Sequence, residues 1–126
     1  MARLSEAERE RLRTLTVEYL LDVRAAYLAA GASPLKHWEQ LQNRMLSAAR
    51  RSTSADEWAT ALCRGLQLPA LGPRGAASLV ALSGAVREAG AARQWLDVVQ
   101  AEYGLLMAMA RLAADAARER REGAAG

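Results

Sequence analysis

The chain has 126 residues, a net charge of +3 at pH 7 and 52% hydrophobic residues, and this length suits one domain with one core. Its single cysteine excludes an intramolecular disulfide and indicates a reducing compartment. One histidine and one cysteine cannot build the usual structural zinc site, so we expect no bound metal. Alanine, leucine, arginine and glutamate are frequent and runs of strand-forming residues are missing, which predicts a single all-α domain over residues 1–126.

The first helix is predicted from Ser5 to about Ala30. Ser5 and Glu8 have the spacing of a capping box, in which each side chain accepts a hydrogen bond from the other residue's backbone N–H, and Gly31 provides the stop. Apolar residues at three- and four-residue steps form one stripe that we expect in the core: Leu12, Leu15, Tyr19, Val23 and Ala26.

Two further helices are predicted in the first half of the chain. Ser33 as N-cap and Pro34 as first helical residue open a helix that should run to about Arg50. Ser54 with Glu57 repeats the capping-box spacing and opens a helix over about 55–66. The residues expected to point inward from these two helices are Trp38, Leu41, Met45, Ala48, Trp58, Ala61 and Leu62.

The second half of the chain predicts a helix over about 73–89, ended by Gly90, and a last helix over about 92–121. The last helix is apolar around most of its circumference, which indicates neighbours on several sides, within the chain or across a dimer. We therefore expect a compact bundle of about five helices with a long, widely apolar C-terminal helix. The two ends of the chain, about residues 1–6 and 119–126, should fray.

Glu102 falls in the middle of the apolar arc of that last helix. A carboxylate is rarely buried unless it is paired, because desolvation disfavours its charged form. We expect a buried ion pair with a basic group from another helix, and Arg24, Arg64 and His37 are the candidates. A catalytic acid is the alternative, but no second catalytic group accompanies it.

The turn between the third and fourth helices is the most specific stretch, reading LQLPALGPRGAASLVAL over residues 66–82. Pro73 suits the first position of a helix, and the free N–H groups of a helix N-terminus attract phosphate. Gly72, Arg74 and Gly75 are the candidate donors. We predict positive φ at Gly72 and solvent-facing N–H groups at Arg74 and Gly75.

This stretch resembles the helix-hairpin-helix motif of DNA-binding proteins that lack sequence preference, over about residues 55–89. The resemblance implies that the hairpin amides, at Gly72, Arg74 and Gly75, contact DNA phosphates. Ala70 departs from the motif, which usually has glycine there. A Pro/Gly turn that joins two ordinary helices explains the same residues, and this alternative stays open.

Positive charge is concentrated beside the turn. Residues 36–74 carry the whole excess of cations over acids, and the remaining parts of the chain are balanced. A local basic excess favours binding to nucleic acid, although such patches are also found as solvated faces. The candidate contacts are Arg44, Arg50, Arg51, Arg64 and Arg74.

The sequence favours no catalytic function, since it contains no nucleophile elbow, P-loop or dinucleotide motif. We expect a non-enzymatic module without cofactors, with no membrane contact and in the cytoplasm, because no stretch is long enough to span a bilayer. Its partner is predicted to be nucleic-acid backbone, bound without sequence specificity. The alternative is a protein–protein adaptor or small helical subunit of a larger assembly. This alternative includes a homodimer formed through residues 95–112.

Overall fold

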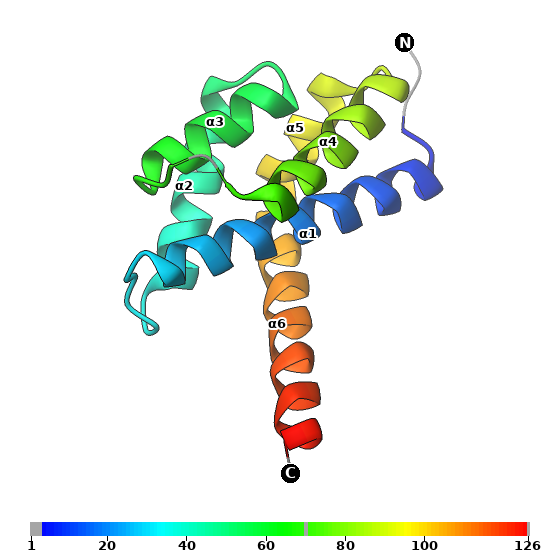
Figure 1. Ribbon diagram of the computed structural model, residues 1–126. Coiled ribbons are helices and arrows are strands. Elements are labelled where there is room, and N and C mark those ends of the chain that lie inside the picture. Colours follow the sequence, from blue (N-terminus) through cyan, green and yellow to red (C-terminus); the bar gives the residue numbers. More distant parts are fainter. Residues whose placement is uncertain (1–3, 70, 126) are drawn as a thin grey trace.

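The computed structural model in Figure 1 describes residues 4–69 and 71–125, and this part of the chain forms helices joined by turns. No strand occurs among these residues, which confirms the all-α prediction. The helices are α1 (Glu6–Ala29), α2 (His37–Arg51), α3 (Ala55–Gly65), α4 (Pro73–Glu88), α5 (Ala92–Ala101) and α6 (Tyr103–Ala125).

Several helix ends lie where the sequence predicted them. Ser5 Oγ accepts from the N–H of Glu8 at 3.1 Å and the Glu8 carboxylate accepts from the N–H of Ser5 at 2.9 Å, so the capping box is confirmed. Gly31 and Gly90 follow α1 and α4 with φ of 99° and 59°, the left-handed conformation that glycine adopts without strain. Pro73 is the first residue of α4.

The predicted start of the second helix is wrong by one turn. The helix begins at His37, and residues 33–36 form a separate turn in which the carbonyl of Ser33 accepts from the N–H of Lys36 and of His37. The imidazole of buried His37 holds this turn against α1, because one ring nitrogen lies 2.9 Å from the Pro34 carbonyl and the other accepts from Arg24 Nε at 2.9 Å.

The predicted single C-terminal helix is also wrong, because it breaks at Glu102 into α5 and α6. Glu102 has φ −112° and ψ 23°, outside the helical range, although no proline precedes it. Its carboxylate Oε1 lies 2.6 Å from Nη2 of Arg13 on α1. The expected ion pair therefore exists, but Arg24, Arg64 and His37 were the wrong candidates.

The Arg13–Glu102 pair is half-buried, with side chains 16% and 25% exposed. The hydrogen bond with Glu102 raises the pKa of Arg13, which keeps the guanidinium charged. Arg13 Nε and Glu102 Oε2 are buried without a partner within the described residues. One hydrogen-bonded contact thus holds the α5–α6 junction to α1.

Aromatic side chains form the centre of the core. The ring of Trp58 packs edge-on against Trp95, with centroids 5.2 Å apart, and lies 5.8 Å from Tyr19. Both indole N–H groups are satisfied: Trp58 donates to the Met45 carbonyl and Trp95 to the Thr16 hydroxyl. Elements far apart in sequence are joined here by buried polar contacts as well as by apolar packing.

Helix α1 crosses the molecule and packs against α4 and α6, while α2 packs against α3 and α5 (Figure 1). Helix α6 runs from this body toward the C-terminus and stays helical to Ala125. Its apolar arc is covered on one side only, because Leu106 and Met107 are buried whereas Leu105 and Leu112 are 46% and 71% exposed. No helix in the described ranges combines the length and apolar character needed to cross a membrane.

Candidate functional site

A groove of about 680 Å³ separates α2 from α3. Its α2 side carries residues at three- and four-residue steps, which share one helix face: Arg44, Ser47, Ala48 and Arg51. Its α3 side repeats this spacing with Glu57, Thr60, Ala61 and Arg64. Alanines face each other in the middle of these rows, so small side chains form the floor and long ones form the rims.

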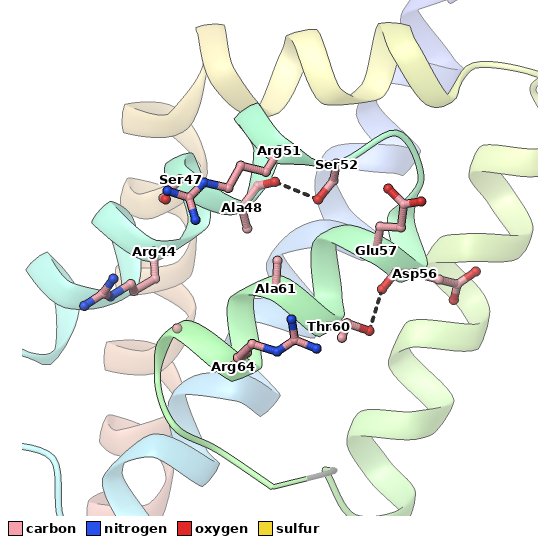
Figure 2. A pocket seen from close by; sticks show the side chains of 11 residues that line it. Arg44, Ser47, Ala48, Arg51, Ser52, Asp56, Glu57, Thr60, Ala61 and Arg64 are labelled. Carbon is pink, nitrogen blue, oxygen red and sulfur yellow. Dashed lines mark hydrogen bonds between the residues drawn. The ribbon is translucent and has the colours of Figure 1, made fainter.

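Three of the predicted basic residues, Arg44, Arg51 and Arg64, line this groove. Figure 2 shows the guanidinium groups of Arg44 and Arg51 on the α2 side and that of Arg64 extended along α3 toward Thr60. All three residues are exposed, and none has an ion-pair or hydrogen-bond partner for its guanidinium in the described part of the chain. Their charges are therefore available to a partner.

The aliphatic stem of Arg44 packs against the backbone of Gly65, which has no side chain. A Cβ built on Gly65 would lie 3.0 Å from Arg44 Cδ, which is tighter than an ordinary contact, and 3.6 Å from Cγ, which is ordinary van der Waals contact. The aliphatic stem of Arg44 thus lies directly on the last residue of α3. This contact brings the arginine of α2 to the end of the groove where Arg64 leaves α3.

Two carboxylates, of Asp56 and Glu57, also line the groove, but both are hydrogen-bonded by neighbours. Asp56 Oδ1 accepts from the Ser83 hydroxyl at 3.0 Å. The Glu57 carboxylate accepts from the N–H and the hydroxyl of Thr53 at 2.9 and 3.0 Å, and these bonds lower its pKa. The second capping box is therefore altered: Ser54 Oγ accepts from the Glu57 N–H as predicted, while Glu57 binds Thr53 rather than Ser54.

Ser47 is a groove residue that is absent from the predicted contacts. Its hydroxyl has no hydrogen-bond partner among the residues described, so it can donate to an anion. The Thr60 hydroxyl is already used, because it donates to the Asp56 carbonyl at 3.0 Å. The three- and four-residue spacing from Arg44 to Arg51 was the sequence pattern that could have identified Ser47.

The remaining predicted arginines lie elsewhere. Arg50 is exposed but does not line the groove. Arg74 lies on a second groove, of about 440 Å³, between α1, α4 and α6, where Arg24 and Arg121 accompany the carboxylates of Glu18 and Asp22. The predicted basic set is thus divided, with three members on one groove.

The Pro/Gly turn differs from its prediction. Gly72 is the exposed N-cap of α4 with φ −66°, so the prediction of positive φ is wrong. The left-handed residue of this connection is Gln67, with φ 58°, just after α3. Gly75 is buried beneath Leu71, whose Cβ would lie 2.6 Å from a Cβ on Gly75, so its predicted solvent-facing N–H is wrong too. Arg74 is exposed, and Ala70 lies outside the described residues.

No group of three or more metal-ligating side chains occurs within residues 4–69 and 71–125. The groove offers three guanidinium groups and the Ser47 hydroxyl to a partner, beside two carboxylates that are hydrogen-bonded within the chain. Comparisons of the chain with protein-family models, with curated proteins and with solved structures found no match. The function is accordingly argued from the geometry of the groove itself.

Proposed function

We propose that this protein is a non-catalytic module that binds nucleic-acid backbone without sequence preference along the α2–α3 groove. The observation that carries the proposal is the set of three guanidinium groups, of Arg44, Arg51 and Arg64, on the rims of one groove without ion-pair partners in the described chain. Structural arginines usually have a carboxylate partner, as Arg13 does here.

The arrangement of the charges favours an extended polyanion over a single ion. Arg44 and Arg51 are seven residues apart on one helix face, which separates their backbones by about 10 Å. Phosphates repeat along a nucleic-acid strand at shorter intervals, so one strand that follows α2 can contact both arginines. Arginine and serine side chains are typical phosphate contacts.

The absence of sequence preference follows from the other groove residues. Among its described lining residues there is no aromatic ring on which a base could stack and no asparagine or glutamine that could read a base edge. We assign Arg74 a secondary contact, since it is exposed at the first turn of α4. The resemblance to the helix-hairpin-helix motif supports this part of the proposal only.

The test measures binding of a fluorescently labelled oligonucleotide by anisotropy over a range of salt concentrations. Replacing Arg44, Arg51 and Arg64 by Gln should abolish most affinity and reduce the slope of log K against log salt by about 2 to 3, because three phosphate contacts are lost. The control variant carries Gln at Arg9, Arg93 and Arg120, which are exposed on α1, α5 and α6. An equal loss in both variants would mean that only net charge matters and that the groove is not the site.

The second candidate function is a protein–protein module, and the exposed apolar residues of α6 favour it. Leu105 and Leu112 are seven residues apart on one face and remain largely exposed, at 46% and 71%. A homodimer through this face should become monomeric when both leucines are replaced by Glu, as measured by sedimentation velocity. A wild-type monomer at high micromolar concentration would reject the homodimer.

A further inference from the structure

A cavity of about 490 Å³ opens between α3, α4 and the segment that joins them. Small-molecule sites typically enclose about 300–1,000 Å³ and are lined mainly by apolar side chains with a few polar groups. This cavity fits that description, since Leu68, Leu71 and Leu79 form much of its wall. It is distinct from the α2–α3 groove, with which it shares only Thr60 and Arg64.

Tyr19 provides a buried polar group in the cavity wall. The residue is only 2% exposed, and its hydroxyl lies 3.7 Å from Cys63 Sγ. Sulfur is a weak hydrogen-bond partner, and no oxygen or nitrogen partner for this hydroxyl occurs within the described residues. Buried tyrosine hydroxyls usually have a full hydrogen bond, so this one retains capacity for an oxygen atom. Burial raises the pKa of Tyr19, which keeps the phenol a neutral donor.

Arg64 provides the charge at the opening of the cavity. It lines the cavity as well as the groove, is exposed, and has no ion-pair partner in the described ranges. Its side chain extends along α3 toward Thr60 (Figure 2). A guanidinium at the rim of an apolar cavity can pair with an anionic head group while the apolar part of the same molecule is buried.

We propose that this cavity binds a small amphipathic carboxylate. Its carboxylate pairs with Arg64, its apolar body packs against Leu68, Leu71 and Leu79, and a carbonyl oxygen on that body accepts from the Tyr19 hydroxyl. These three contacts correspond to the three kinds of surface that the cavity presents. The proposal does not depend on nucleic-acid binding. Arg64 lines both sites, but Tyr19 and the three leucines line the cavity alone, and Arg44 and Arg51 line the groove alone.

The test uses three probes of matched size: octanoate bearing a ketone on its penultimate carbon, plain octanoate, and methyl hexyl ketone. The keto acid should bind saturably at millimolar concentration, with NMR shifts concentrated on the methyl groups of Leu68, Leu71 and Leu79. The uncharged ketone should bind at least tenfold more weakly, and octanoate severalfold more weakly, because each lacks one polar contact. Saturation should also slow alkylation of Cys63, which is the only cysteine and lines the cavity.

Variants at exposed positions assign the contacts. Arg64→Gln should remove the preference for the keto acid over the ketone. Ala76→Phe should fill the cavity and abolish binding, whereas Ala77→Phe, on an adjacent exposed residue outside the lining, should not. Arg51→Gln should bind the keto acid unchanged, which separates this site from the groove.

Three results would overturn the proposal: no saturable binding of the keto acid, equal binding of acid and ketone by the wild type, or unchanged binding by Ala76→Phe. Thermal unfolding of each variant is measured in parallel, so that loss of binding is interpreted only for folded protein. If Ala76→Phe does not fold, Arg64→Gln and the protection of Cys63 decide the outcome.

Discussion

At the junction of α5 and α6 an arginine is paired and half-buried, whereas along the α2–α3 groove three arginines are exposed and have no ion-pair partner in the described part of the chain. Arg13 contacts the Glu102 carboxylate at 2.6 Å and ties helices that are distant in sequence. The guanidinium groups of Arg44, Arg51 and Arg64 link no helices by an ion pair in the described residues. The same residue type therefore serves structure in one region and is left available for binding in the other.

The difference shows that the role of an arginine is indicated by whether a carboxylate lies beside it in the fold, and less by the net charge of its segment. Residues 36–74 carry the net positive charge, yet their arginines lie on different faces, and only three share a groove. Arg13 lies in a part of the chain with no net charge, where the sequence indicated no special role. Substitutions in the two regions should therefore have different effects, on stability at the α5–α6 junction and on binding at the α2–α3 groove. They are given from the largest expected effect to the smallest.

Glu102→Ala should destabilise the fold by about 1–3 kcal/mol, because it leaves the half-buried Arg13 guanidinium without its partner. The effect should be smaller than the roughly 3–5 kcal/mol of a fully buried pair, since both side chains keep some contact with water. Thermal or urea unfolding measures it, and nucleic-acid affinity should not change.

The control for this prediction is Glu88→Ala. Glu88 pairs with Arg11 at 3.7 Å, but the two side chains are 75% and 64% exposed, so the cost should be about 0–1 kcal/mol. Replacing Arg13 by Met together with Glu102 by Leu should restore much of the stability. Equal midpoints for Glu102→Ala and Glu88→Ala would show that the junction pair contributes no more than a surface pair.

Gly65→Ala should weaken nucleic-acid binding without loss of stability, which is the opposite of the result expected for Glu102→Ala. The new Cβ would lie 3.0 Å from Arg44 Cδ and would shift the Arg44 stem slightly, so the loss of affinity should be modest, while alanine in place of glycine can add up to about 1 kcal/mol of helix stability. Anisotropy and thermal unfolding measured on the same samples distinguish the two effects. Gly84→Ala on α4 is the control, because a Cβ there meets nothing within 4 Å.

The smallest expected effect concerns Glu57, whose carboxylate lines the groove but is bound by Thr53. Because these hydrogen bonds lower its pKa in the folded protein, the ionised carboxylate stabilises the fold at neutral pH. This contribution should disappear as the pH falls through the lowered pKa. Glu57→Gln should therefore be slightly less stable than wild type at pH 7 and equally stable in strong acid. A constant difference across this range would contradict the assignment.

For the candidate site, the sequence identified residue types but not their grouping. The spacing of Arg44 and Arg51 on one helix face was visible, and α3 had an arginine near its end. That Arg64 meets them across a groove depends on how α2 and α3 pack, and on Gly65 accepting the Arg44 stem. The burial of Gly75 under Leu71 likewise required the path of the turn.

By itself, the sequence determined the all-α class and the helix ends that depend on local chemistry: the Ser5–Glu8 box, the stop at Gly31, the start at Pro73 and the stop at Gly90. Side-chain caps, proline and positive-φ glycine act within a few residues, so a local pattern is sufficient to predict them. The break at Glu102 and its pairing with Arg13 were decided only by tertiary structure. The two residues are 89 positions apart, and nothing in the local sequence selects one partner among several arginines before the helices pack.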